Sequence, residues 1–180
     1  MVAVASREIR DGDLVFVGMR LPILAYAVAR STHAPTARGL FEVGLMRDSA
    51  ASGYLGTMGD PPNVAGALWA TRMSNVMALM AQGLVDRVSF ITSPGNGDGS
   101  PGWRRRHRLL GGGPAAIITT LCVFRFPEGG GEAYLDSIHP GHTFEEVQKE
   151  TGWAIAGARD VRVTPEPTPA ELAEIRRRSA

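Results

Sequence analysis

The chain has 180 residues, of which 44% are hydrophobic and 21% are charged, and its formal net charge is +1. This composition predicts one well-cored globular domain and excludes a disordered chain. Because the charge is close to zero and Lys149 is the sole lysine, nothing in the charge balance favours a nucleic-acid or membrane partner.

The cellular compartment follows from two further features of the sequence. Cys122 is the single cysteine and lies in an apolar stretch, which predicts a buried thiol and excludes an internal disulfide. No apolar run reaches the roughly 20 residues that a membrane span needs, and charged residues come too early for a signal peptide. We therefore expect a cytoplasmic protein.

The first fifty residues predict a strand, a helix and a second strand. Residues 13–18 read DLVFVG, residues 21–35 place apolar side chains at helical spacing after Pro22, and residues 39–44 read GLFEVG. This order is typical of a βαβ unit with parallel strands. Glu42 then lies at or just past the end of the second strand, where open α/β sheets hold their chemistry. A strand-end carboxylate that caps the backbone or pairs with Arg47 is the alternative interpretation.

The rest of the chain predicts further helices and strands. A helix is expected over residues 73–81, and its methionine-rich face is interpreted as core. Residues 88–92, 115–126 and 132–140 predict strands. Two helix starts carry capping boxes, Thr143 with Glu146 and Thr168 with Glu171, which give neither glutamate a catalytic role.

Three short motifs could carry chemistry, and each has a simpler interpretation. His139 and His142 are spaced by Pro-Gly, which favours a turn over a metal site. The basic stretch 103–108 could contact phosphate or form a solvated loop. Gly111, Gly112 and Gly113 could bind phosphate through backbone N–H groups, but they lack the lysine and hydroxyl of a P-loop.

The motifs in their order resemble one family. The sequences DGDLVFVG, GLFEVGLMRD, ITSPGNGDG, GGGPAAIITTLCVFRF, YLDSIHPG, TFEEVQKETGW and TPAELAEIR follow one another as in the β subunits of family I CoA-transferases, especially the glutaconate CoA-transferase type. The resemblance implies a shortened α/β fold of the CoA-transferase type, with an open, mostly parallel sheet and flanking helices, in a single domain over residues 1–180. It covers nearly the whole chain.

The resemblance also implies a reaction. Glu42 matches the glutamate that attacks an acyl-CoA thioester and then carries CoA as a glutamyl thioester, which needs a desolvated carboxylate beside a small neighbour such as Gly44. The loop of Thr92, Ser93, Pro94 and Gly95 and the loop of Gly111, Gly112 and Gly113 are expected near CoA. CoA would be a substrate and covalent intermediate, with no permanently bound cofactor and no metal.

One difference from the family concerns the middle of the chain. Near residues 86–88 the family carries about 60 further residues, including a Gly-rich loop, and the loss of such hydrogen-bond donors commonly costs about a hundredfold in rate. We expect a β-like subunit that works beside an α-like subunit in a hetero-oligomer. The alternatives are a non-catalytic structural or regulatory subunit and a hydrolase or decarboxylase of CoA esters.

Overall fold

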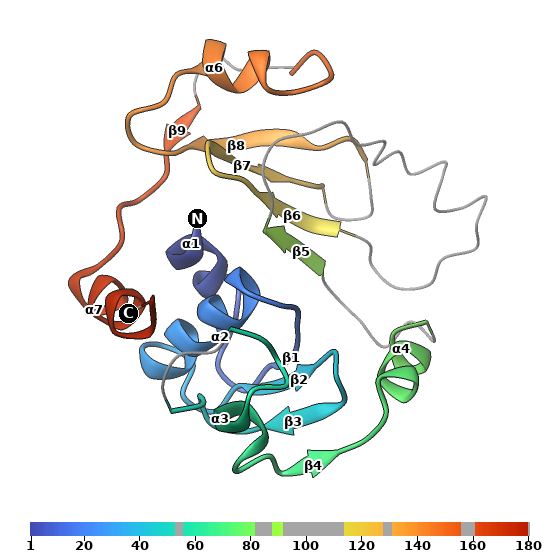
Figure 1. The fold of residues 1–180 in the computed structure, drawn as a ribbon. Helices are drawn as coiled ribbons and strands as arrows, with labels where there is room; N and C mark the ends of the chain where they lie inside the picture. The colour runs from blue at the N-terminus through green and yellow to red at the C-terminus, as the bar shows by residue number, and fades with distance from the viewer. Residues whose placement is uncertain (53–55, 82–87, 92–113, 128–130, 156–160, 180) are drawn as a thin grey trace. The chain divides into compact units, whose positions relative to one another are not determined.

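A computed structural model describes residues 1–52, 56–81, 88–91, 114–127, 131–155 and 161–179 (Figure 1). The chain divides into two compact units, one of residues 2–80 with 167–180 and one of residue 1 with residues 81–166. Each unit has its own sheet. The assignment of the whole chain to a single domain stays a prediction.

The first unit contains a four-stranded sheet in the order β1-β2-β3-β4. Strands β1 and β2 are parallel, and the other neighbours are antiparallel. Its elements are α1 (Val2–Arg7), β1 (Leu14–Val17), α2 (Leu21–Ser31), β2 (Arg38–Phe41), β3 (Leu45–Arg47), α3 (Pro61–Val64), β4 (Trp69–Ala70), most of α4 (Met73–Ala81) and α7 (Pro169–Ser179).

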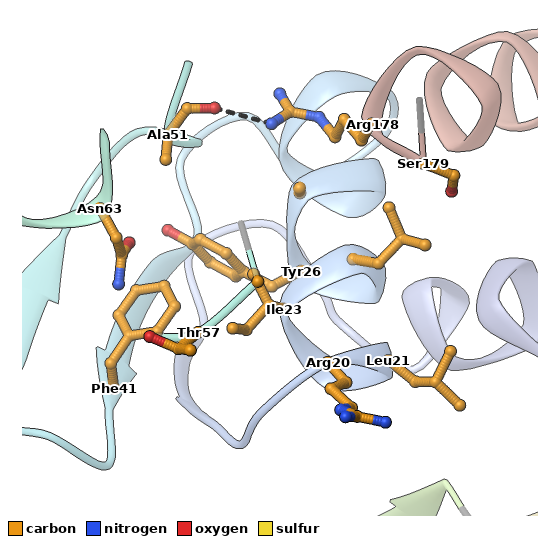
Figure 2. Close-up of a pocket in the computed structure, with 13 residues that line it drawn as sticks. Arg20, Leu21, Ile23, Tyr26, Phe41, Ala51, Thr57, Asn63, Arg178 and Ser179 are labelled. Carbon is orange, nitrogen blue, oxygen red and sulfur yellow. Dashed lines mark hydrogen bonds between the residues drawn. The ribbon is translucent and has the colours of Figure 1, made fainter. Parts of the chain in front are cut away.

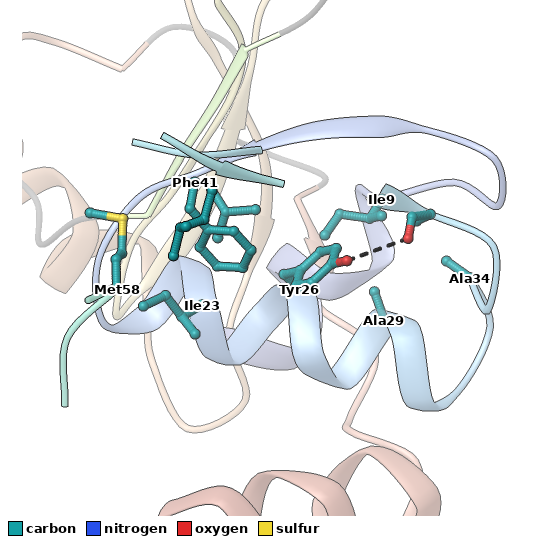
Figure 3. Packing of buried hydrophobic residues seen from close by; sticks show 10 residues of the cluster. Ile9, Ile23, Tyr26, Ala29, Ala34, Phe41 and Met58 are labelled. Carbon is teal, nitrogen blue, oxygen red and sulfur yellow. Dashed lines mark hydrogen bonds between the residues drawn. The ribbon is translucent and has the colours of Figure 1, made fainter. Parts of the chain in front are cut away.

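The predicted βαβ unit is confirmed in β1, α2 and β2, with Pro22 in the first turn of the helix. The core that joins them is centred on Tyr26, whose ring meets that of Phe41 edge-on at a centroid distance of 5.7 Å (Figure 3). A Cβ on Gly39 would come within 2.8 Å of the Tyr26 ring. Gly39 therefore allows α2 to pack closely against the sheet.

Arg47 is a buried cation that binds main-chain oxygen atoms. Its side chain donates to the carbonyls of Ser49 (3.1 Å), Pro62 (3.3 Å), Asn63 (2.6 Å) and Ala65, while its residue is only 4% exposed. Each acceptor found for this guanidinium among the described residues is neutral. The hydrogen bonds of Arg47 thus connect the segment between β3 and β4 to the end of β3.

Both capping boxes that the sequence predicted are present at the starts of helices. Thr143 and Glu146 form the predicted capping box at the start of α6 (Phe144–Lys149). Thr168 and Glu171 form the second, with the Thr168 N–H donating to Glu171 at 2.7 Å. Arg7 also binds both carboxylate oxygens of Glu171, at 2.8 and 2.7 Å, and so fastens α7 to α1.

The second unit contains a five-stranded sheet in the order β5-β6-β7-β8-β9. The pairs β5/β6 and β8/β9 are parallel, and the two central pairs are antiparallel. The strands are β5 (Val88–Ile91), β6 (Pro114–Ile118), β7 (Cys122–Arg125), β8 (Tyr134–Ile138) and β9 (Arg162–Val163). Cys122 is fully buried, as predicted, and burial raises the pKa of its thiol.

The structure differs from the sequence predictions in two places. Residues 115–126 form two antiparallel strands instead of one, because the Thr119 hydroxyl accepts from the N–H groups of Leu121 and Cys122 and turns the chain. In α4 the expected core stripe is wrong for Met73 and Met77, which are 52% and 37% exposed, whereas Val76 is buried.

The α/β class is confirmed, and both sheets are mixed in strand direction. Among the helices that the structure describes, none has the length and apolar character required to cross a bilayer.

We expect Arg47→Met to lower the free energy of unfolding by about 2–4 kcal/mol, because it leaves buried carbonyl groups without donors. Chemical denaturation measures the change. Arg38→Met is the matched control, since the Arg38 side chain is exposed on β2, and it should shift stability by less than about 0.5 kcal/mol. Equal effects of the two substitutions would contradict the role of the Arg47 contacts.

Candidate functional site

The carboxyl edge of the parallel pair β1/β2 is the candidate site. Val17 pairs with Phe41 at the end of the two strands, so the residues that follow each strand leave the sheet at the same edge. Residues 18–20 lead from β1 into α2, and Glu42 follows β2 directly. The start of α2 and Glu42 therefore share this edge, as the sequence predicted for Glu42.

Glu42 lies in a tight turn between β2 and β3. The Gly44 N–H donates to the Phe41 carbonyl at 2.8 Å, which closes the turn. Glu42 is half-buried, and the described part of the chain provides no hydrogen bond or ion pair to its carboxylate. The alternative in which Glu42 pairs with Arg47 is not seen, because Arg47 donates to residues 49 and 62–65 instead.

Gly44 fixes the backbone of this turn. Its φ is +100°, and a Cβ at this position would come within 2.1 Å of the Thr71 carbonyl oxygen. The Thr71 N–H donates to the Gly44 carbonyl at 2.7 Å, so the chain after β4 passes directly over the turn. The resemblance implied that the small Gly44 leaves room for a substrate. On the side of Gly44 that faces Thr71, the main chain of Thr71 fills this room.

Arg20 is a feature of this edge that the sequence did not indicate. It precedes α2 and has a φ of +59°, which makes it the one non-glycine residue with positive φ in the described part of the chain. Its side chain makes no capping hydrogen bond, and the first turn of α2 has no acidic residue. The positive end of the α2 dipole is therefore available to an anion at this edge. A strained backbone leaves no pattern in the sequence, so sequence analysis could not identify Arg20.

The predicted CoA loops cannot be compared with this geometry. The loop of Thr92, Ser93, Pro94 and Gly95, the loop of Gly111, Gly112 and Gly113, and the basic stretch 103–108 lie outside the described residues. Their proximity to Glu42 stays a prediction.

His139 and His142 have different structural roles. The Nδ1 atom of His139 lies 2.9 Å from the Thr164 hydroxyl, and its Nε2 lies 3.0 Å from the Thr119 carbonyl, which requires a proton on Nε2. The exposed His142 contacts Glu146 at 3.3 Å. Within the ranges that the structure describes, no three residues with metal-binding side chains come together.

We expect stability to fall as the pH drops below about 6.5, the ordinary pKa of histidine. Burial lowers the pKa of His139 in the folded protein. As the pH falls, the unfolded chain therefore binds a proton at position 139 before the folded protein does, and this protonation stabilises the unfolded state relative to the folded state. Urea denaturation between pH 7.5 and 5.5 measures the fall. His139→Gln should make it shallower, and an unchanged slope in that variant would contradict the assignment. His142 is present in both proteins, so the difference between slopes reports on position 139.

Comparison with known proteins gives relatives among CoA-transferase subunits. The chain is 40% identical over 118 residues to the β subunit of 3-oxoadipate CoA-transferase from Pseudomonas knackmussii, a match that covers 66% of this chain and 44% of the relative. The chain thus spans less than half of that relative's length. It is 24% identical to the β subunit of glutaconate CoA-transferase from Acidaminococcus fermentans, over 95% of this chain and 87% of the relative. No model of a protein family matches the chain.

The second alignment extends over 235 positions, more than the 180 residues of this chain, so that relative carries residues absent here. Solved structures support the same fold. Glutaconate CoA-transferase of Acidaminococcus fermentans aligns with a TM-score of 0.78 at 19% identity, covering 97% of this chain and 91% of that chain. The decarboxylase AibA/AibB aligns with a TM-score of 0.74 at 24% identity, covering 98% and 92%.

Proposed function

We propose that this chain belongs to the β subunits of the family I CoA-transferases and is the β-like half of a two-subunit enzyme, which its similarity to two CoA-transferase B subunits supports. The enzyme moves CoA from an acyl-CoA to a carboxylic acid. Its partner is an α-like subunit, and CoA is a substrate and covalent intermediate with no permanently bound cofactor. The proposed compartment is the cytoplasm, and neither nucleic acid nor membrane takes part.

The observation that carries this proposal is the state of Glu42. Its carboxylate follows β2 at the carboxyl edge of a parallel strand pair, is half-buried, and has no partner within the described ranges. A carboxylate tied up in an ion pair would lose nucleophilicity, whereas this one keeps its lone pairs available. The crossing of Thr71 over Gly44 holds the turn rigid, which favours a defined angle of attack.

The proposed reaction has two symmetrical halves. A Glu42 oxygen attacks the carbonyl carbon of the acyl-CoA thioester, the carbon–sulfur bond breaks, and an acyl-glutamyl anhydride and CoA thiolate form. The thiolate attacks the glutamyl carbonyl of the anhydride, which releases the first carboxylate and leaves a glutamyl-CoA thioester. The acceptor carboxylate then attacks this thioester, and the reverse sequence yields the new acyl-CoA and free Glu42.

Each step develops negative charge on a carbonyl oxygen. The N-terminus of α2 lies at the same edge as Glu42 and provides a positive field there. The resemblance adds two loops near CoA, Thr92 to Gly95 and Gly111 to Gly113. We propose that their backbone N–H groups supply the remaining hydrogen bonds to the substrate.

Two alternatives remain testable beside the transferase. A decarboxylase or hydrolase of CoA esters is favoured by the fold that this chain shares with the decarboxylase AibA/AibB. A non-catalytic subunit is favoured by the residues that this chain lacks relative to the β subunit of glutaconate CoA-transferase. Incubation with an acyl-CoA followed by borohydride or hydroxylamine distinguishes the transferase from both alternatives, because a transferase alone accumulates a modified Glu42.

We expect Glu42→Gln to reduce CoA exchange by about 10⁴-fold or more, because the amide keeps the shape of the side chain and loses the nucleophile. The matched control is Glu150→Gln, an exposed carboxylate after α6, which should retain full exchange. Exchange of label between acyl-CoA and free acid measures both. Retained exchange in Glu42→Gln would remove the nucleophile from the proposal.

We also expect the chain to need a partner for a monodisperse state. Large apolar side chains are exposed in the first unit, including Leu68, Trp69 and Met73 at 56%, 43% and 52%. Expressed alone at micromolar concentration, the chain should sediment as an oligomer or aggregate. Co-expression with an α-like subunit should give a soluble complex. A stable 19 kDa monomer without affinity for such a subunit would contradict the two-subunit proposal.

A further inference from the structure

The carboxyl ends of three strands of the first sheet meet at the edge that carries Glu42. Strands β1 and β2 are parallel, and β4 runs in the direction of β2 because β3 is antiparallel to both of its neighbours. Arg20 follows β1, Glu42 follows β2 and Arg72 follows β4. Figure 2 shows Arg20 at the start of α2. A carboxylate and two arginines therefore follow strands that end at the same edge.

The main chain at Arg72 is fixed against the turn that carries Glu42. The Thr71 N–H donates to the Gly44 carbonyl at 2.7 Å, and the carbonyl carbon of Arg72 lies 3.2 Å from the position of a Cβ on Gly44. The Arg72 carbonyl accepts from the Asn75 N–H at 3.0 Å, and the Thr71 hydroxyl accepts from the Asn75 side chain at 2.8 Å. These bonds hold Arg72 directly before α4 and beside the Glu42 turn.

The charges of this turn leave one cation available. The segments that form and cover the turn, residues 41–47 and 69–75, contain one carboxylate, Glu42, and two cations, Arg47 and Arg72. Arg47 is buried and donates to main-chain carbonyls. Arg72 is exposed, and the ranges that the structure describes contain no hydrogen bond or ion pair to its guanidinium. Its N–H donors are therefore available to a ligand beside Glu42.

The proposed reaction brings a second carboxylate to Glu42. Once Glu42 carries CoA, an oxygen of the acceptor carboxylate attacks the glutamyl carbonyl carbon, the carbon–sulfur bond breaks, CoA leaves as the thiolate and an anhydride forms. The acceptor loses water when it enters the site, and the free Glu42 carboxylate of the resting enzyme repels it. A cation beside the turn offsets both effects, and arginine binds a carboxylate through two parallel N–H···O bonds.

We infer that Arg72 binds the carboxylate of the acid that exchanges CoA at Glu42. The inference rests on the proposed transfer reaction and adds a binding residue to it. The Arg72 guanidinium holds the acceptor carboxylate until it attacks, and it receives the first carboxylate when the thiolate cleaves the anhydride. The long arginine side chain provides the reach that this role needs. Because Arg72 binds the reacting carboxylate, monocarboxylic and dicarboxylic acids of equal length depend on it alike.

Binding of free acids to the full chain, alone or with its co-expressed α-like subunit, tests the inference without turnover. The probes are pentanoate and glutarate, which have chains of equal length and differ in their number of carboxylates. We expect Glu42→Gln, which is uncharged at this position like the thioester, to bind both at least about fivefold more tightly than the wild type. Adding Arg72→Met should weaken both at least about tenfold in isothermal titration calorimetry.

Three results of the binding experiment would overturn the inference. The first is the same affinity with and without Arg72, and the second is no binding of either acid to Glu42→Gln. The third is a loss for glutarate alone, which would show that Arg72 contacts a distant carboxylate instead of the reacting one.

The kinetic constants of exchange separate a binding role from a structural one. Arg72→Met should lower kcat/KM for the acceptor acid about tenfold and that for the acyl-CoA less than about threefold. Arg72→Lys should recover part of the loss, because it keeps the charge and loses the paired bonds. The matched control is Arg38→Met, an exposed arginine at the opposite end of β2, which should behave like the wild type.

Equal losses in both constants, or a matching loss in Arg38→Met, would overturn the role of Arg72. Absence of exchange in the wild type would instead refute the proposed function, because the binding of free acids needs no turnover.

Discussion

The buried guanidinium of Arg47 is the interaction on which the first unit depends. A cation at 4% exposure is unfavourable unless its hydrogen-bond capacity is filled, and here main-chain carbonyls between residues 49 and 65 fill it. These bonds fix the segment that carries the chain from β3 to β4. β4 in turn pairs with β3, and the next residue, Thr71, crosses over Gly44. The backbone of the Glu42 turn is thus positioned by a residue that does not touch the Glu42 carboxylate.

The same contacts connect the turn to the core of the first unit. The Tyr26 hydroxyl donates to the Arg47 carbonyl at 3.2 Å, while its ring packs on Phe41, the residue before Glu42. Asn63 accepts from Arg47 through its main chain, and its side chain donates to the Met58 carbonyl at 2.6 Å. One hydrogen-bonded network therefore holds the core beneath the Glu42 turn.

The sequence predicted those features that depend on local patterns. The βαβ unit, the position of Glu42 after β2, both capping boxes and the buried Cys122 follow from periodicity, turn residues and apolar context. Features set by contacts distant in sequence were missed. The Thr119 turn uses a side-chain hydroxyl inside a run that has strand composition throughout. The exposure of Met73 and Met77 depends on what packs against α4, which helical spacing alone does not specify.

This chain lacks residues that the β subunit of glutaconate CoA-transferase has. We expect their absence to affect the proposed reaction more than the position of Glu42. Every contact found for the Glu42 turn within the described ranges comes from residues 41–72, and the core beneath it from residues 9–58. All of these precede residues 86–88, where we place the shortening. The first unit can therefore present Glu42 without the missing segment. In the proposed reaction, we expect the absent residues to have been a source of hydrogen-bond donors for developing negative charge, which the α2 N-terminus at the same edge would replace only in part. We propose that an α-like subunit supplies further donors, so that the proposed enzyme would depend on its partner for turnover more than for the placement of Glu42.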